Sequence, residues 1–209
     1  MKQLLIRSLI FTLFASLVLT VQGRKFIFPF EIVISKADLI VIGQIDTLKN
    51  NSYTFKINET IKGINLKNIT VEKFKPWLCD PLLYEYKTGQ KFCLFLKMRL
   101  THWSLINAST GELLISNDSV TLKYEEYTAQ ENDFIPYKLS VNELKSGIIE
   151  FCKCYKFIGK YYRFKDEPSF RQKCCDQKII EFKKSSQFAT WLNAKMSDYV
   201  IRKRWKYRC

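Results

Sequence analysis

The chain has 209 residues, 47% of them hydrophobic, and a formal net charge of +14. That length fits one domain with an appendage or two small domains. Its single histidine, His102, excludes a metal site built on two histidines and a catalytic relay of several histidines. We expect His102 to be a loop residue. The positive charge raises affinity for polyanions and acidic surfaces without identifying which one.

Residues 1–23 have the order of a secretory signal peptide. Lys2 and Arg7 are followed by an apolar run over 8–21 and by Gly23. A retained membrane anchor is the alternative, because the run approaches the roughly 18 residues that span a bilayer. Hydroxyl residues interrupt the run, which favours cleavage. We therefore predict a secreted, periplasmic or otherwise extracellular protein with no transmembrane segment after the signal is removed.

The segment 26–30 is apolar and contains Pro29, so we interpret it as an edge strand or a plug over a barrel mouth. The next segment, 37–45, alternates apolar side chains on both faces and contains Gly43, which predicts a buried central strand that bends at the glycine. Strict alternation over 53–61 predicts a half-exposed strand, and Gly63 a turn.

Further strands are expected at 69–71, 92–96, 103–106, 113–115 and 120–127. Between the strands expected at 69–71 and 92–96, the two prolines of the Pro76–Pro81 segment exclude regular structure. An irregular loop needs a contact that holds it in place. A disulfide from Cys79 to Cys93 would supply that contact and would stabilise the folded protein by roughly 3 kcal/mol in the chain-entropy model.

These central residues resemble the netrin-like domains, which include the tissue inhibitors of metalloproteinases. The resemblance rests on Ala37–Ile45, on the alternating strand that ends in Lys62-Gly63, on Cys79 and on Gly89–Phe95. It covers about the central third of the chain and implies a five-stranded oligonucleotide/oligosaccharide-binding (OB) barrel. In those inhibitors an N-terminal cysteine binds the protease zinc. No cysteine precedes Cys79 here, so the resemblance does not carry over that mechanism.

From about residue 131 the pattern becomes helical and basic. Ser140 and Glu143 have the spacing of a capping box ahead of apolar residues at helical spacing up to Cys152. Gly147 costs this helix about 1 kcal/mol relative to alanine. The segment 166–169 is interpreted as the start of a short helix. A last helix is expected from Ser185 or Ser186, with apolar residues on one face up to Val200.

The predicted fold is therefore mainly β, with an OB-like barrel over residues 24–130 and a smaller α-helical, cysteine-containing region over 131–209. The second region is much the more basic. It has 18 basic and 9 acidic residues and a charge of +9, against 14 basic, 11 acidic and +3 for the first.

Seven cysteines follow the predicted signal peptide, which in an exported chain favours disulfides over zinc binding. An adjacent pair seldom bonds to itself, so Cys174 and Cys175 are expected to bond elsewhere, for instance to Cys152 and Cys154. Because seven is odd, one thiol is left over, and Cys209 is the candidate. The complete set of disulfide candidates is Cys79, Cys93, Cys152, Cys154, Cys174 and Cys175.

The C-terminal cluster interleaves cations with aromatic side chains and is a candidate contact for a polyanion or an acidic membrane surface. An alternative is a solvated helix end whose aromatic residues pack back onto the protein. The candidate contact residues are Arg202, Lys203, Arg204, Trp205, Lys206 and Arg208. Five Asn-x-Ser/Thr sequons are candidate glycosylation sites in a eukaryotic host: Asn50, Asn58, Asn68, Asn107 and Asn117.

Together these patterns predict an exported binding module with no catalytic centre, no cofactor and no metal. Its partner would be a protein or an anionic polymer or surface, engaged through the barrel loops and the basic C-terminal face; no specific nucleic-acid motif is present. One alternative is a secreted protease inhibitor that acts without an N-terminal cysteine. Another is an enzyme that uses carboxylates dispersed in the sequence, although the adjacent acidic pairs are interpreted as solvated.

Overall fold

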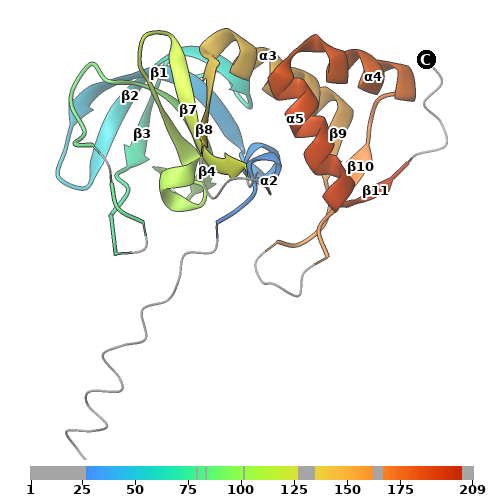
Figure 1. Ribbon diagram of the computed structural model, residues 1–209. Helices are drawn as coiled ribbons and strands as arrows, with labels where there is room; N and C mark the ends of the chain where they lie inside the picture. The colour runs from blue at the N-terminus through green and yellow to red at the C-terminus, as the bar shows by residue number, and fades with distance from the viewer. Residues whose placement is uncertain are drawn as a thin grey trace, which may run out of the picture.

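A computed structural model describes residues 27–78, 80–82, 84–100, 102–126, 135–161 and 167–203. A β-barrel lies beside a group of helices, and the short helix α2 (Phe30–Lys36) lies between them (Figure 1). The predicted signal peptide falls outside the described residues. Among the described helices, none combines the length and the apolar character needed to cross a bilayer.

The barrel is closed by five strands. In chain order they are β1 (Leu39–Leu48), β2 (Ser52–Lys62), β3 (Asn68–Glu72), β4 (Lys91–Arg99) and β5 (His102–Leu105). β1 pairs with both β2 and β4, and the circuit closes through β3 and β5. The β3–β5 pair is parallel and the other pairs are antiparallel. The prediction of a mainly β fold with a five-stranded OB-like barrel is thus confirmed.

The chain has two hydrophobic cores, and β1, like β4, contributes side chains to both. Leu39, Val41 and Ile45 are buried inside the barrel, whereas Ile40 is buried in a second core outside it. The two apolar faces that the sequence shows are therefore both used. At Gly43 a Cβ atom would lie 2.1 Å from the carbonyl oxygen of Lys56, so only glycine permits this crossing of β1 and β2.

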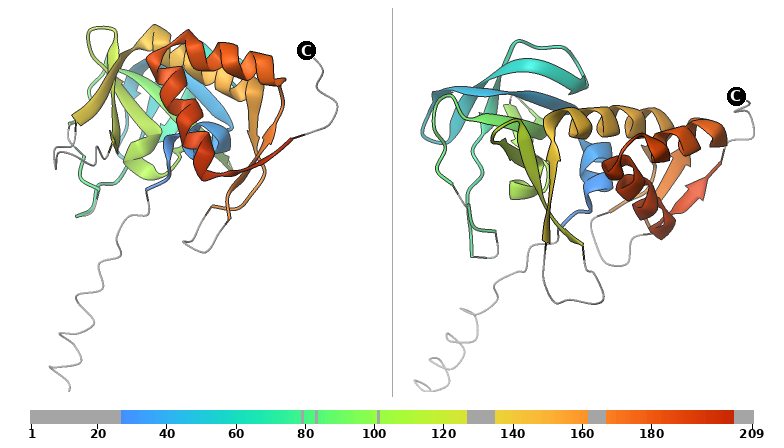
Figure 2. Two further views of the ribbon diagram at one scale, coloured as in Figure 1. Left: turned by 45° about the vertical axis from the view of Figure 1, so that its right-hand side comes forward. Right: turned by 45° about the horizontal axis from the view of Figure 1, so that its top comes forward.

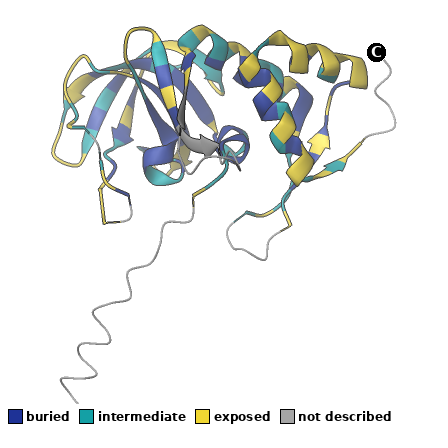
Figure 3. Cartoon of the chain, viewed as in Figure 1, coloured by how far each residue is buried: buried dark blue, intermediate teal, exposed yellow. Residues whose placement is uncertain are grey.

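The edge strand expected at 26–30 is not formed: residues 27–29 are irregular and Phe30 begins the helix α2. The carbonyl of Pro29 accepts hydrogen bonds from Ile32 and Val33, which starts α2. All residues from Phe30 to Ile34 are buried (Figure 3). Its four apolar side chains, Phe30, Ile32, Val33 and Ile34, are enclosed by the barrel and the C-terminal helices.

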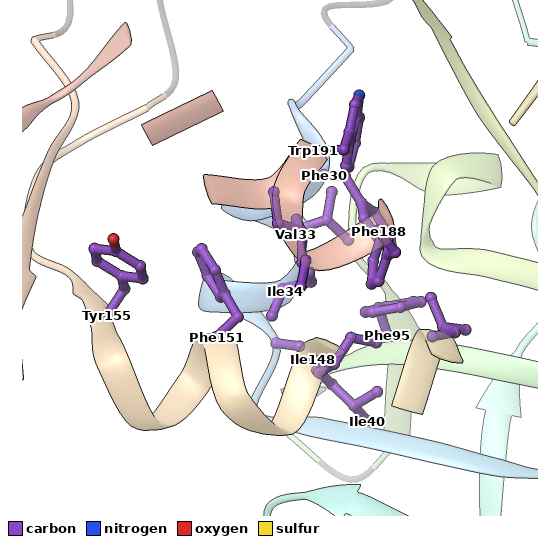
Figure 4. Close-up of a cluster of buried hydrophobic side chains, with 14 of the residues drawn as sticks. Phe30, Val33, Ile34, Ile40, Phe95, Ile148, Phe151, Tyr155, Phe188 and Trp191 are labelled. Atoms are coloured by element: carbon purple, nitrogen blue, oxygen red, sulfur yellow. The ribbon is translucent and has the colours of Figure 1, made fainter. Parts of the chain in front are cut away.

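The second core forms around α2. Phe30 packs on Phe95 of β4, with ring centroids 5.2 Å apart, and on Phe188 of the last helix, at 6.1 Å (Figure 4). Ile148 and Phe151 approach from a further helix. Residues from the barrel and from the C-terminal region thus belong to one hydrophobic cluster, with α2 between them.

The C-terminal region contains three helices and a small sheet. The helices are α3 (Val141–Cys154), α4 (Asp176–Ser185) and α5 (Gln187–Lys195). The sheet consists of β9 (Tyr155–Phe157), β10 (Ser169–Gln172) and β11 (Val200–Arg202), with β10 and β11 parallel. Figure 2 shows this sheet beneath the helices.

Shorter elements connect the two parts. Strand β6 (Glu112–Ile115) pairs with β4, and β7 (Ser119–Glu126) pairs with β8 (Ile135–Ser140) as a ribbon that spans the predicted boundary near residue 130. The 3₁₀ turns η1 (Ala108–Gly111) and η2 (Met196–Asp198) follow β5 and α5.

The helix caps that the sequence predicts are formed in part. The Ser140 hydroxyl accepts a hydrogen bond from the Glu143 amide at 3.1 Å, as the capping box predicts. The Glu143 carboxylate, however, accepts from the Phe188 amide at 3.1 Å and so caps α5 instead of its own helix. Ser186 caps α5 as expected, through a 3.0 Å bond from the Ala189 amide.

Two helix predictions were wrong in the same region. The last helix ends at Lys195, and Val200 belongs to strand β11. The expected helix at 166–169 is absent from the described part of that segment, where Ser169 begins strand β10. Pairing between β10 and β11 overrides the helical period of the sequence, because each strand completes hydrogen bonds of the other.

Candidate binding groove at the barrel loops

A groove of about 490 Å³ opens where β3 and β5 part. The two strands pair only at Val71 and Trp103, and beyond that point the chain of each turns away. The groove is lined from one side by Glu72 to Lys75 and Trp77, and from the other by Arg99, Ser104, Leu105, Asn107 and Ala108. It therefore combines the loop after β3 with the hairpin between β4 and β5.

The charge of the groove is mainly positive. Lys75 and Arg99 are exposed and Lys73 is half-buried, and none of the three makes a side-chain ion pair in the described part of the chain. The acidic residue, Glu72, lies 3.4 Å from the imidazole of His102. His102 is the first residue of β5, so the prediction that it belongs to a loop was wrong.

Apolar side chains stand exposed beside these cations. Trp77 is 44% exposed and packs edge-on against Phe74, with ring centroids 5.5 Å apart. The neighbouring Leu78 is 76% exposed, and Leu100, next to Arg99, is 100% exposed with a φ of 39°. These exposed side chains offer apolar surface to a partner.

The Pro76–Pro81 loop is irregular, as predicted, but it is held by other residues than expected. The backbones of Trp77 and Asp80 bond to each other, and the buried Asp80 carboxylate accepts hydrogen bonds from the amide (3.2 Å) and the hydroxyl of Ser109. Asp80 thereby fixes the loop to η1 and sets the position of Trp77 at the groove.

The predicted disulfide between Cys79 and Cys93 is not formed. Cys93 is a free cysteine whose side chain is fully buried in the core, and burial raises the pKa of its thiol. Alternation along β4 points Cys93 away from the loop and toward the second core, so it packs as a small apolar residue. Cys79 lies outside the described residues.

The C-terminal cysteines bond partly as predicted. Cys154 and Cys174 form a disulfide. Cys175 is also disulfide-bonded. Cys152 was expected to bond as well, but it is a free cysteine, beside Lys62 and Lys173, on a different face of α3 from Cys154. Cys209 lies outside the described residues.

The structure describes two residues of the predicted basic C-terminal cluster and all five sequon asparagines. Arg202 and Lys203 are exposed, Lys203 makes a 3.2 Å ion pair with Asp176, and the other four candidate contact residues lie outside the described residues. Four sequon asparagines are exposed. The fifth, Asn107, is partly buried, and its side-chain oxygen accepts hydrogen bonds from the Phe28 amide (2.9 Å) and the Thr110 hydroxyl (2.8 Å).

A buried acidic cluster lies inside the barrel. Glu112 has no exposed surface, and both of its carboxylate oxygens lie 2.9–3.0 Å from the hydroxyl of Tyr86. Burial and this carboxylate raise the pKa values of Tyr53, Tyr84 and Tyr86. A carboxylate without exposed surface cannot touch a substrate, so the cluster holds the 84–86 segment against the barrel.

Metal-binding geometry is not found in the described part of the chain, where no three His, Cys, Asp or Glu side chains gather. Comparison of the sequence with protein-family models and with curated protein sequences finds no match. The groove must therefore be interpreted from its own residues. The two prolines correctly predicted the irregular loop. The sequence did not identify Lys73, Lys75 and Arg99 as site residues, because only the fold brings the end of β4 to this loop.

Proposed function

We propose that the protein is an exported, non-enzymatic binding module whose groove takes an acidic, partly apolar segment of a partner protein. The observation that carries this proposal is a groove that combines the exposed side chain of Trp77 with three cations, which make no ion pair within the described residues. The exposed Leu78 and Leu100 are chain neighbours of the lining residues Trp77 and Arg99. Export is supported by the order of residues 1–23 and, weakly, by the Cys154–Cys174 disulfide. The closed barrel is compatible with the proposed netrin-like relationship.

A protein partner explains the apolar side chains better than a polysaccharide does. Protein interfaces have an apolar centre in which tryptophan often contributes most of the binding energy, with charges around it. Trp77, Leu78 and Leu100 would form that centre, and Lys73, Lys75 and Arg99 the surrounding charges. A sulfated sugar would pair with the cations but would leave the two leucines in water. The basic C-terminal face would supply a second, less specific attraction.

The test is selection from a displayed library of random peptides against the whole protein. We expect enrichment of peptides that contain both acidic and large apolar residues. The variant Lys75→Glu/Arg99→Glu should lose at least tenfold in affinity for the selected peptides, and Trp77→Ala a similar factor. The matched control is Lys87→Glu/Lys91→Glu, which changes the net charge equally with exposed residues at or just before the start of β4, the end of that strand away from Arg99.

Equal losses in the groove variant and in the control would contradict the proposal, since they would show attraction by net charge alone. Heparin provides the second probe. If heparin binding depends on Lys75 and Arg99 while no peptide is enriched, the groove takes an anionic polymer and the protein-partner proposal is wrong. Circular dichroism of each variant checks that the barrel is still folded.

A further inference from the structure

A small pocket of about 240 Å³ lies where the barrel, α2 and the C-terminal region meet. It is formed by the end of β2, the end of α2, the junction of α3 with β9, and the residue after β10. Pockets for drug-sized ligands have about 300–1,000 Å³, so this one fits a smaller molecule. None of its residues lines the groove at the barrel loops. Its side chains include Lys62, Cys152, Tyr155, Lys156, Phe157 and Lys173.

The charged side chains of this pocket are all lysines. Lys62, Lys156 and Lys173 make no ion pair within the described residues. Burial lowers the pKa of the half-buried Lys62, and the like charge of Lys173 lowers it further. Asp38 attracts Lys62 from outside the pocket, but its carboxylate accepts the Met98 amide at 3.2 Å. Three cations at one small pocket create a potential that attracts an anion.

Hydrogen bonds hold two of the ammonium groups in place and leave donors for a ligand. Lys62 Nζ donates to the carbonyl oxygens of Ile34 (3.0 Å) and Ser35 (2.9 Å), at the end of α2. Lys173 Nζ donates to the carbonyl oxygen of Cys152 (2.8 Å), near the end of α3. An ammonium group has three donors, so one of Lys62 and two of Lys173 remain. The two helix ends supply about half a negative charge each, so about two of the three positive charges remain to be balanced.

The titratable side chains other than the lysines are neutral at neutral pH. Burial raises the pKa of the Cys152 thiol, although the two neighbouring lysines lower it in part. Burial also raises the pKa of Tyr155 to about 12, and its hydroxyl donates to the side-chain oxygen of Asn193 at 3.0 Å. Neither group repels an anion or balances the lysines. Tyr155 and Phe157 add aromatic surface to the lining.

We propose that this pocket binds the phosphate group of a small phosphate monoester, with the ammonium groups of Lys62, Lys156 and Lys173 around it. Such a phosphate carries a charge of about −1.5 to −2 at pH 7 and three acceptor oxygens, which match the charge and the remaining donors. A sulfate monoester or a carboxylate carries a single negative charge and matches them less well. The aromatic residues would contact the organic part of the ligand. Because Lys62 belongs to the barrel and Lys173 to the C-terminal region, the ligand would also join the two parts.

The first test uses the Cys152 thiol, which lines the same pocket, as a reporter of binding. The whole protein is treated with iodoacetamide, and mass spectrometry follows alkylation of the Cys152 peptide as phenyl phosphate is added at constant ionic strength. We expect a saturable decrease in rate of at least about fivefold. Phenyl sulfate, with less charge, and inorganic phosphate, without a ring, should each require at least about three times the concentration for half protection.

Each comparison can contradict a part of the proposal. If phenyl sulfate protects as well as phenyl phosphate, the preference for a doubly charged group is wrong. If inorganic phosphate protects as well, the ligand is the free ion and the monoester is wrong. If none of the three slows the alkylation of Cys152 at millimolar concentration, the pocket is not an anion site and the whole proposal is overturned.

The second test locates the site with charge variants whose folding is verified by circular dichroism. Lys156→Met and Lys173→Met should each raise the half-protecting concentration of phenyl phosphate at least about tenfold. Lys156 is exposed and belongs to no ion pair in the described part of the chain, so its replacement leaves the helix ends intact. The matched control is Lys183→Met, which removes the same charge from an exposed position of α4 outside the pocket and should have less than about a twofold effect. If both pocket variants behave like this control, phenyl phosphate binds elsewhere and the proposal is wrong.

Discussion

Gly147 in α3 offers a sharp test of the packing between helices. By helix propensity alone, Gly147→Ala should stabilise the protein by about 1 kcal/mol. In the structure, however, a Cβ atom at this position would lie 2.4 Å from Cδ1 and 2.7 Å from Cε1 of Phe188. The two predictions have opposite signs, so one measurement decides between them.

The clash should win, because Phe188 cannot move away. Its ring is fully buried, stacks on Trp191 at 5.9 Å and contacts Phe30 at 6.1 Å. Overpacking of a close-packed core costs about 1–3 kcal/mol. With no free direction for the ring we expect the upper part of that range, and subtracting the propensity gain leaves a net loss of about 1–2 kcal/mol.

Chemical denaturation and thermal unfolding measure this loss, which should lower the melting temperature by about 2–8 °C. Ser146→Ala is the control, because it changes an exposed neighbour in the same helix and should leave the stability close to that of the wild type. Adding Phe188→Leu to Gly147→Ala should recover part of the loss. A Gly147→Ala protein as stable as the wild type would refute the argument that α3 and α5 touch through this glycine.

Three further predictions concern single side chains. The buried Glu31 carboxyl has its pKa raised by burial and lowered in part by the Tyr199 hydroxyl, so Tyr199→Phe should raise that pKa further and destabilise by about 1–3 kcal/mol. A carboxyl group whose pKa is raised in the folded protein adds to the stability below its unfolded pKa of 4.5, and this contribution is lost as the pH rises. Urea unfolding should therefore show that Tyr199→Phe loses more stability at pH 7 than at pH 4. Equal losses at the two pH values would contradict this prediction. Asp80→Ala should release the groove loop from Ser109 and speed its cleavage in limited proteolysis, again at about 1–3 kcal/mol, and unchanged cleavage would show another anchor. In a glycosylating host, mass spectrometry should find glycans at exposed sequons but not at Asn107, whose side chain is engaged in the fold.

The sequence predicts most strands of the barrel because their side chains alternate. The strand at 53–61 shows one apolar face, and β1 shows two, which correctly indicates burial on both sides. Helix α2 was missed for the complementary reason. Four of its seven residues are apolar, namely Phe30, Ile32, Val33 and Ile34, and so short a run fits a strand or a helix equally well until its surroundings are known.

The candidate site could be predicted only in part. Two prolines mark the irregular loop, but the residue that fixes it, Asp80, looks like any loop aspartate in the sequence. Arg99 is at the end of a strand far along the chain from Lys73, and only closure of the barrel brings them to one groove. The prediction of a Cys79–Cys93 disulfide fails for a similar reason, because Cys93 faces a core that includes residues of the C-terminal helices.

The position of α2 has a consequence for the order in which the molecule acquires its structure. This helix is made early in synthesis, yet it packs against Phe188 and Trp191, about 160 residues later in the chain. Contacts of such long sequence separation slow folding, because a large loop must close before they form. The second core can therefore assemble only after nearly the whole chain has left the ribosome.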